Sequence, residues 1–373
     1  MLKLWYIANY RLPSSRAHGI QTVAMCQALA QQGMAVTLVL PRRRFSQPEA
    51  IGSFYNLKPL FSIRNIPCVD LVGMIPVLGF WLQSLTFMIG VWFSLVRCPA
   101  DTAIYSRDPF SAYILSFTGR RVIFEIHQFP RKLKWWHKLF FRRPIFFVAI
   151  SQALVSELKQ LGIAEKRVLL APDGVDLELF PSQKTSEECR RLFRLPAEKK
   201  LLVYTGSLSR EKGLAVMMES LSLLPADFLL VIAGGSTAEI KQWTDQLYQD
   251  QLAKVQWLGW LPHQQIPDVL QAADILIIPN SGRYRSSGRY TSPLKLYEYL
   301  STAKPLVAAD VESLRSIMAE QAGVFYFQPD QASSFVAAVG LATRDISHQY
   351  RRAASGYSWS NRAESIIRNF LNV

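Results

Sequence analysis

Short apolar runs recur along the whole chain, and stretches with helical spacing of apolar residues separate them. A run of four to eight apolar residues without alternation is typical of a strand that is buried on both faces, as in parallel sheets. We expect twelve such strands, six in each half of the chain, at residues 4–8, 35–40, 103–106, 122–126, 146–150, 168–171, 201–205, 228–233, 255–258, 275–279, 306–309 and 324–327. The alternation of strands and helices predicts an α/β fold.

Two sets of strands in 373 residues predict two doubly wound, Rossmann-like domains of roughly 150–200 residues each. The polar stretch 181–200, with a short helix around 186–193, is the expected linker. We therefore place an N-terminal domain at 1–178 and a C-terminal domain at 179–356. Open parallel sheets bind ligands at the carboxyl ends of their strands, so we expect an active site where the two domains face each other across a cleft.

Residues 71–96 contain no charged side chain and are long enough to span a bilayer. Three glycines and a proline interrupt this stretch, which lies inside the alternating pattern of the first domain. A spanning helix at this position would disrupt that domain. We therefore expect a buried or membrane-resting pair of helices, with a transmembrane helix as the alternative.

Residues 290–310 predict a helix that begins at Ser292 and Pro293, because serine is a good N-cap and proline suits the first turn. The free N–H groups of a helix start attract anions, and Lys295 would add to that attraction. Glu298, about one turn further on, suits hydroxyl groups better. The combination predicts a site for a phosphate next to a sugar ring. The alternative is a capped surface helix in which Lys295 and Glu298 form an ion pair.

A second candidate anion site lies at residues 201–221, where a strand leads into Gly206 and Ser207 and then to Lys212 at a helix start. A strand, a loop of small residues and a helix start can together cradle an anion. The spacings of a P-loop and of a dinucleotide fingerprint are both absent. On spacing alone, the simpler interpretation of Lys212 is a solvated lysine.

The formal net charge of +14 is divided unequally between the two halves. Residues 1–175 contain 21 Lys and Arg against 8 Asp and Glu, whereas residues 176–373 contain 21 against 20. The first half is therefore expected to face an anionic partner, either a phosphate-rich polymer or a membrane surface. The four cysteines are scattered without a CxxC pair, which predicts reduced cysteines in a cytoplasmic protein and no zinc site.

Seven segments occur in a fixed order along nearly the whole chain, and together they are highly specific. They are "SSRAHGIQ" (14–21), "FEIHQFP" (124–130), "VAISQAL" (148–154), "APDGVDLELF" (171–180), "YTGSLSREKG" (204–213), "SPLKLYEYLSTAKPLV" (292–307) and "YSWSNRAE" (357–364). In this order they resemble the retaining glycosyltransferases of the GT-B fold, the large family-4 type. The resemblance implies a nucleotide-sugar donor on the C-terminal domain, an acceptor on the N-terminal domain, and a tail helix at 357–373 that crosses back to the N-terminal domain.

The resemblance also implies roles for residues that match the motifs of the family. Glu298 matches the glutamate that hydrogen-bonds the nucleotide ribose, and Lys212 matches the lysine that holds the donor diphosphate. The backbone that lies against this diphosphate corresponds to Pro293, Leu294 and Lys295. Lys212 and Glu298 are therefore expected to act in catalysis as well as in donor binding.

Two matches fall in the N-terminal domain. His127 matches the histidine near the transferred sugar, where it would orient the sugar and stabilise the anomeric centre as a neutral group. The alternative is a histidine that caps the strand at 122–126. Gly19 matches a glycine loop that lets the diphosphate approach this domain.

The chain departs from the family pattern at two positions. The first glutamate of the family's E-x7-E element is replaced by Tyr290, which leaves the donor sugar open. The arginine that often accompanies the phosphate lysine is replaced by Ser207, so Lys212 is expected to hold the diphosphate with Arg210 or Lys295. No DxD pair follows a predicted strand, and we therefore expect metal-independent departure of the leaving group, with no cofactor besides the donor.

The segment 131–143, "RKLKWWHKLFFRR", contains six Lys and Arg, four Trp and Phe, and no acid. This composition favours binding to an anionic membrane surface. The contact residues would be Arg131, Lys132, Lys134, Trp135, Trp136 and Lys138. Stacking on single-stranded nucleic acid and a loop whose aromatic residues pack on the domain are the alternatives; the neighbouring motifs belong to no nucleic-acid module, so we expect no nucleic-acid partner.

The sequence thus predicts a retaining glycosyltransferase that moves a sugar from a nucleotide-diphosphate sugar to a lipid-linked or membrane-bound saccharide in cell-surface polysaccharide or glycolipid synthesis. We expect a cytoplasmic protein that is peripheral at the inner face of the plasma membrane. One alternative is a sugar-nucleotide epimerase on the same fold. The other is a non-catalytic basic protein that binds membrane or nucleic acid.

Overall fold

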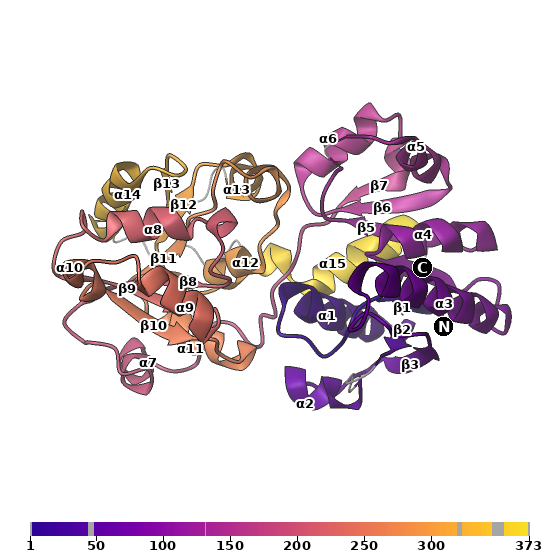
Figure 1. The fold of residues 1–373 in the computed structure, drawn as a ribbon, viewed down its shortest axis with the longest axis horizontal. Coiled ribbons are helices and arrows are strands. Elements are labelled where there is room, and N and C mark those ends of the chain that lie inside the picture. The colour runs from indigo at the N-terminus through magenta and orange to yellow at the C-terminus, as the bar shows by residue number, and fades with distance from the viewer. Residues whose placement is uncertain (1, 44–47, 131, 319–322, 345–353, 372–373) are drawn as a thin grey trace. The chain divides into compact units, whose positions relative to one another are not determined.

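The structure is a computed structural model that describes residues 2–43, 48–130, 132–318, 323–344 and 354–371. The chain divides into two compact units, Met1–Pro172 with Trp359–Val373, and Asp173–Ser358. Each unit contains one parallel sheet with helices packed on it (Figure 1). The stretch 181–200, expected as a linker, belongs to the second unit, where its helix α7 (Ser186–Leu192) packs against α11 (Ile266–Ala272).

The first unit contains a seven-stranded sheet with the order β3-β2-β1-β4-β5-β6-β7, in which all pairs are parallel. Its strands are β1 (Lys3–Ile7), β2 (Ala35–Arg42), β3 (Ser62–Pro67), β4 (Ala103–Ser106), β5 (Val122–Ile126), β6 (Ile145–Ala149) and β7 (Val168–Leu170). Six of them were predicted. β3 was missed because it is an edge strand with alternating exposure and therefore has no continuous apolar run.

Helices cover both faces of this sheet. In Figure 1, α3, α4 and α5 follow one another along one side of the unit, and α15 packs on α1. The helices are α1 (Ala17–Gln31), α2 (Ile51–Tyr55), α3 (Pro76–Val96), α4 (Pro109–Leu115), α5 (Trp135–Arg142), α6 (Gln152–Gln160) and α15 (Trp359–Ile366), which continues as a π-helical turn (Ile367–Leu371).

Within the apolar stretch 71–96, residues 76–96 form one continuous helix, α3, so the expected pair of helices is wrong. Its glycines are points of close packing and do not break the helix. A Cβ atom at Gly79 would lie 2.5 Å from the carbonyl oxygen of Leu71, and one at Gly90 would lie 2.4 Å from Cγ2 of Ile66. By length and composition alone, α3 could cross a membrane, and about one third of it is buried.

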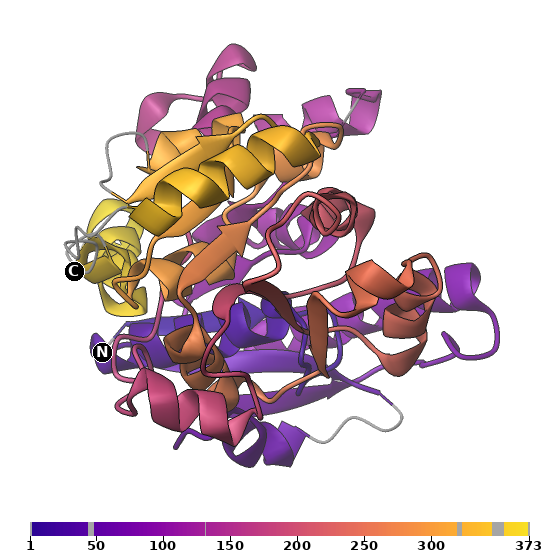
Figure 2. The same ribbon diagram turned by 90° about the vertical axis from the view of Figure 1, so that its left-hand side faces the viewer.

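The second unit contains a six-stranded parallel sheet with the order β10-β9-β8-β11-β12-β13. All six strands were predicted: β8 (Lys200–Thr205), β9 (Phe228–Ala233), β10 (Val255–Gly259), β11 (Ile275–Ile278), β12 (Leu306–Ala309) and β13 (Val324–Phe327). The remaining helices are α8 (Leu214–Ser220), α9 (Thr237–Thr244), α10 (Gln249–Leu252), α12 (Leu294–Leu300), α13 (Glu312–Met318) and α14 (Ala332–Arg344). The last of these, drawn in gold in Figure 2, packs along β13 and β12.

Candidate functional site

Two lysines of the second unit form a buried cationic site. The ammonium group of Lys295, on α12, is buried and has no hydrogen-bond partner within the part of the chain that the structure describes. It lies 3.8 Å from the centroid of the Tyr204 ring. Burial and then the charge of Lys212 hold the pKa of Lys295 well below its usual value, and burial also lowers the pKa of Lys212. The charges of Glu298 on Lys295 and of Glu211 on Lys212 act in the opposite direction, but they do not outweigh burial.

The backbone around these lysines requires glycine. Gly206, directly after β8, has a φ of 138°, and a Cβ atom there would lie 2.8 Å from Nζ of Lys295. Gly213 has a φ of 79°, and its Cβ atom would lie 1.7 Å from the carbonyl oxygen of Pro279. The two glycines thus let the loop after β8 and the 3₁₀ turn Arg210–Lys212 pack close to Lys295 and to the end of β11.

A carboxylate lies on the same helix as Lys295. Glu298 is buried on α12, and its Oε1 accepts a hydrogen bond of 2.8 Å from Nε2 of His263. Burial would lower the pKa of His263, but the hydrogen bond and the charge of Glu298 outweigh it and raise the pKa. The alternative of a surface helix with a Lys295–Glu298 ion pair is therefore wrong, because Glu298 is buried and pairs with His263.

The start of α12 differs from the prediction. The helix begins at Leu294, and Pro293 is the N-cap, with an extended backbone (φ −75°, ψ 128°). Ser292 does not cap the helix: its Oγ accepts a hydrogen bond of 3.0 Å from the N–H of Asp173 and lies 2.7 Å from the hydroxyl of Tyr297. Ser292 therefore ties the first residue of the second unit to α12.

The two departures from the family pattern have distinct surroundings. Tyr290 is buried, and its hydroxyl accepts a hydrogen bond of 2.5 Å from Arg285. Ser207 is exposed, and its carbonyl oxygen accepts a hydrogen bond from Tyr204. The guanidinium of Arg210 lies 5.5 Å from the ring centroid of Trp243. Of the two cations expected to assist Lys212, the structure thus brings Lys295 close to Lys212 and stacks Arg210 on a tryptophan.

The first unit contains a polar network around His127, just after β5. Nε2 of His127 lies 2.6 Å from Oε1 of Glu125, and Arg107 donates to Nδ1 at 3.3 Å. Since an arginine can only donate, Nδ1 accepts and the ring proton is on Nε2. Glu125 is buried and is also contacted by the hydroxyl of Tyr105, by Nε of Arg107 at 3.4 Å and by the guanidinium of Arg362 at 3.0 Å.

The network keeps His127 neutral. Burial and then the charge of Arg107 lower the pKa of His127 from 6.5 to about 4, although Glu125 acts in the opposite direction. Burial would raise the pKa of Glu125, but Arg362, the hydrogen bond from His127 and Arg107 hold it well below its usual value. A neutral ring held in one orientation fits both the sugar-orienting role and the strand-capping alternative.

We expected Gly19 in a loop, but it lies in a helix. It belongs to the first turn of α1, where a Cβ atom would lie 2.5 Å from the hydroxyl of Tyr55 and 2.6 Å from the carbonyl oxygen of Ser14. The glycine thus allows the loop before α1 to fold back onto the helix.

Sequence reasoning missed four residues of these networks: Arg107, Glu125, His263 and Arg362. Glu125 had a signal, because it is the one charged residue in a strand of the pattern VIFEI and lies two positions before His127, on the same face. The other three are brought in by elements distant in sequence, and no local pattern marks them.

The segment 131–143 contains the helix α5. On α5, Phe140 and Phe141 are buried against the sheet, whereas Trp135 and Trp136 are exposed. The membrane residues predicted from the sequence are exposed where the structure describes them, at Lys132, Lys134, Trp135, Trp136 and Lys138, while Arg131 lies outside the described residues. The four described cysteines are free, and no cluster of three or more metal-ligating side chains occurs in the described ranges.

Comparisons with known proteins agree with this architecture. A model of the Glycosyltransferase Family 4 matches residues 19–179, and a model of the Glycosyl transferases group 1 matches residues 199–345. TuaC of Bacillus subtilis (strain 168), whose name assigns it to teichuronic acid biosynthesis as a glycosyltransferase, is 24% identical over 90% of this chain and 87% of its own. The crystal structure of Anabaena HepE in complex with UDP superposes with a TM-score of 0.76 at 14% identity and covers 100% of both chains.

A third relative is the UDP-Gal:alpha-D-GlcNAc-diphosphoundecaprenol alpha-1,3-galactosyltransferase of Escherichia coli, which is 20% identical over 50% of this chain and 48% of its own. Two parallel α/β sheets of seven and six strands define a protein of the GT-B class. The chain belongs to the group 1 glycosyl transferases of family 4. It is thus a retaining, metal-independent glycosyltransferase that uses a nucleotide-sugar donor.

Proposed function

We propose that this protein transfers a sugar from a UDP-sugar to a lipid-linked saccharide during the synthesis of a cell-surface polysaccharide or glycolipid. HepE crystallised with UDP and with UDP-glucose supports the choice of base. The name of the Escherichia coli relative includes both a UDP-sugar donor and a diphosphoundecaprenol acceptor. TuaC, which matches most of the chain, is named for teichuronic acid biosynthesis.

The unpartnered ammonium of Lys295 is the observation that carries the donor site. A buried cation is costly unless an anion balances it, and here a second, partly buried cation, Lys212, acts on it. A donor diphosphate supplies the missing negative charge. It would bind against the glycine loop at Gly206, with Lys212 and Lys295 on its oxygens.

Glu298 gives the site a second, hydroxyl-binding end. His263 occupies Oε1 of Glu298, and the carboxylate has a second oxygen that can accept from the ribose hydroxyls. A carboxylate repels a phosphate and accepts hydroxyl protons, so it orients the nucleotide with its ribose toward Glu298 and its diphosphate toward the lysines. This arrangement matches the roles that the family motifs imply.

The site supports departure of a nucleoside diphosphate without a metal. When the bond between the anomeric carbon and the diphosphate oxygen breaks, its electrons remain on that oxygen, and Lys212 and Lys295 stabilise the added charge. In a retaining reaction the acceptor hydroxyl attacks from the face that the diphosphate leaves, and its proton passes to the departing phosphate. His127 is neutral and so is not the proton source, and we assign it to orienting the sugar.

We also propose that α5 holds the protein at the inner face of the plasma membrane. Lys132, Lys134 and Lys138 are exposed beside Trp135 and Trp136. Cations suit anionic headgroups, and tryptophan suits the interface between headgroups and acyl chains. A lipid-linked acceptor would then be presented to the basic unit that carries α5.

The proposed function is tested by UDP release from UDP-glucose, UDP-galactose and UDP-N-acetylglucosamine in the presence of lipid-linked saccharides. One of the three is expected to turn over with retention of the anomeric configuration. Loss of a single charge-stabilising group costs about 100-fold or more in rate, and we expect this for Lys212→Ala. The matched control is Lys241→Ala, an exposed lysine paired with Asp245. Release of an epimerised nucleotide sugar without transfer would favour the epimerase instead.

A further inference from the structure

One face of α3 exposes a continuous apolar stripe. Leu78, Trp81, Leu85, Ile89 and Phe93 follow one another at spacings of three and four residues, so they lie on the same side of the helix. Each is at least 48% exposed, and Phe93 is 69% exposed. Three further apolar side chains of α3 are also exposed, namely Val77, Phe80 and Val96. A surface of this size and apolarity marks a binding site in a folded protein.

The opposite face of α3 fixes the helix to the first unit. Gly79, Gln83, Phe87, Val91 and Leu95 recur every fourth residue and are buried. Two buried hydrogen bonds of 2.9 Å also hold α3 to the segment that follows β1: Gln83 donates to Asn9, and Asn9 donates to Ser84. A helix that crossed a membrane would have to break these contacts. The geometry therefore favours a helix that stays on its sheet and presents its apolar stripe outward.

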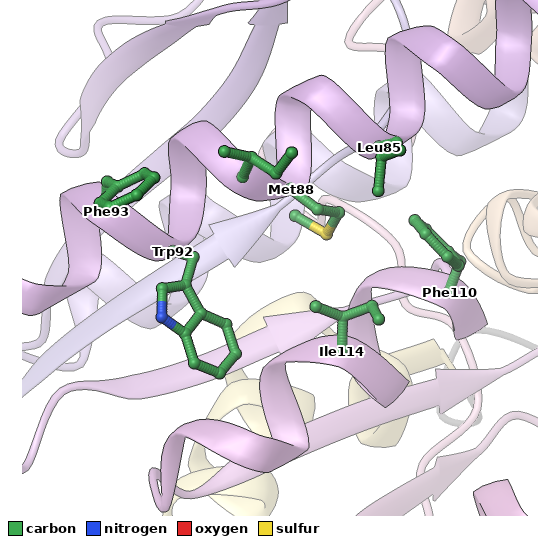
Figure 3. Close-up of a pocket in the computed structure, with 7 residues that line it drawn as sticks. Leu85, Met88, Trp92, Phe93, Phe110 and Ile114 are labelled. Atoms are coloured by element: carbon green, nitrogen blue, oxygen red, sulfur yellow. The ribbon is translucent and has the colours of Figure 1, made fainter.

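A groove runs between α3 and α4, next to the stripe. It has a volume of about 170 Å³, and apolar side chains of both helices point into it (Figure 3). These side chains belong to Leu85, Met88, Ile89, Trp92, Phe93, Phe110 and Ile114. A dry apolar cavity of about 150 Å³ is known to hold benzene, so the groove has room for a segment of hydrocarbon chain.

The surroundings of the stripe are basic and aromatic. α4 contacts α3, and the ring of Tyr113 on α4 contacts the buried Phe140 of α5, so the three helices lie next to one another along one side of the unit (Figure 1). Phe117, at the end of α4, is half exposed, and the guanidinium of Arg143 lies 3.8 Å from its ring. Neither α3 nor α5 contains an acidic residue. The acids Asp70 and Asp101 lie before and after α3 in the sequence, and Asp70 is paired with Arg11 and Arg43. The carboxylate of Asp108 caps α4.

We propose that the stripe of α3 and the groove beside it seat in the acyl-chain region of a lipid bilayer, with α3 parallel to the membrane plane. The inference extends the membrane association proposed for α5 and does not depend on that contact. An apolar helix face bordered by cations and tryptophan complements a bilayer, which offers acyl chains next to anionic phosphates. A second copy of this chain is a poorer occupant, because a symmetric contact would bring two basic surfaces together.

The test is flotation with vesicles of phosphatidylcholine and phosphatidylglycerol at about 1 M NaCl, where the Debye length is only about 3 Å. The α3 variant combines Leu78→Gln, Trp81→Gln and Phe93→Gln. Its control combines Leu192→Gln, Leu223→Gln and Leu341→Gln, which are similarly exposed in the second unit. We expect salt-resistant binding of the parent and the control to exceed that of the α3 variant at least tenfold, as for a contact made by burial of apolar side chains. Equal flotation of parent and α3 variant would overturn the proposal.

Two further measurements cover the case in which the α3 variant does not fold. Chain-brominated phosphatidylcholine should quench the tryptophan fluorescence of the parent. The combined change Trp81→Phe and Trp92→Phe should reduce this quenching to the part that Trp135 and Trp136 of α5 contribute. Unchanged quenching would contradict a seated α3. Sedimentation of the parent without lipid should show a monomer, and a dimer that the α3 variant dissociates would assign the stripe to a second copy.

UDP release with a water-soluble acceptor analogue separates this inference from the proposed function. The α3 variant should keep the parent's rate in that assay, because none of its three substitutions lies in the donor site. A parent that floats but transfers no sugar would overturn the proposed function and leave the lipid contact standing. A parent that transfers sugar but does not bind vesicles at high salt would overturn the lipid contact of α3 and leave the proposed function standing.

Discussion

Lys295 is expected to favour binding of the donor diphosphate and to lower the stability of the unliganded protein. Its ammonium is buried without a hydrogen-bond partner among the described residues, and its pKa lies well below the usual value. The native state therefore bears the cost of a buried charge that the Tyr204 ring and the charge of Glu298 balance only in part. A donor diphosphate would recover that cost on binding. Replacing the lysine should consequently affect affinity and stability in opposite directions.

Lys295→Met should raise the stability of the unliganded protein by about 1–3 kcal/mol at neutral pH, because an unpaired buried charge is replaced by an apolar group of similar length. In the parent, the unfolded state binds more protons than the native state between the lowered pKa and the ordinary value of about 10.4, so stability rises with pH in that window. The variant should lack this rise. Thermal unfolding at several pH values measures both effects, and a variant that is less stable than the parent throughout would contradict them.

His127 should remain neutral over the whole physiological range. Its pKa of about 4 predicts that the Cε1–H resonance of His127 stays constant between about pH 8 and pH 5.5 and moves only in more acidic solution. Below about pH 6.5 the unfolded state gains a proton that native His127 does not, so the native state loses stability as the pH falls toward 4. An NMR titration, with His127→Asn to assign the signal among five histidines, checks this. A midpoint near 6.5 would be inconsistent with the Arg107–His127–Glu125 network.

At the scale of elements, α15 is joined to the sheet by a buried charge. Arg362 pairs with Glu125 of β5 at 3.0 Å and also donates to the carbonyl oxygen of Ala171 at 3.2 Å. The network that holds His127 thus includes a residue from the far end of the sequence. The tail helix therefore supports the polar network of the first unit as well as packing on α1.

Arg362→Met should destabilise the protein by about 3–5 kcal/mol, the usual cost of removing one partner from a buried ion pair. Arg362 lowers the pKa of Glu125, so the stability that it adds is present above the ordinary carboxyl pKa and is lost as the pH falls. The difference in unfolding free energy between parent and variant should therefore be largest near neutral pH and shrink in acid. Arg368→Met, an exposed arginine on the same tail, is the matched control and should change stability by less than about 0.5 kcal/mol. Denaturant unfolding compares the two variants, and equal midpoints would show that the pair contributes nothing.

The α5 contact makes a salt-dependent prediction that the α3 contact does not. Converting Arg131, Lys132, Lys134 and Lys138 to Gln should weaken binding to anionic vesicles at low salt, since each cation near such a surface contributes on the order of 1 kcal/mol. Binding at high salt should change little, because ions screen these charges. Flotation at low and high salt distinguishes the two helices. If the quadruple variant floats like the parent at low salt, α5 is not the electrostatic contact.

For the whole molecule, sequence reasoning recovered most of the fold. Twelve strands were predicted from continuous apolar runs, because a parallel strand that is buried on both faces is apolar at nearly every residue. The pattern failed at β3, an edge strand with polar positions, and it suggested a break in α3 where glycines in fact pack closely. The polar stretch predicted as a linker lies within the second unit, where α7 packs against α11.

The candidate site was predicted in part. Lys212, Lys295 and Glu298 were visible because local motifs carry them, and the structure brings the two lysines together. The partner His263 and the pair of Arg107 and Arg362 were not visible, because contacts between distant segments leave no local pattern. Family motifs thus identified the candidate site residues, whereas the neighbouring charged groups that shift their pKa values became apparent only from the folded chain.

The central claim is that Lys212 and Lys295 form a diphosphate site, and calorimetric titration with UDP tests it most directly. The parent should bind UDP, and Lys212→Ala and Lys295→Met should each weaken binding at least tenfold, about 1.4 kcal/mol or more, because hydrogen bonds from charged groups are worth about 1.5–3 kcal/mol. The exposed control Lys241→Ala should bind UDP with the affinity of the parent. Parent-like affinity for UDP in both folded lysine variants would contradict the account.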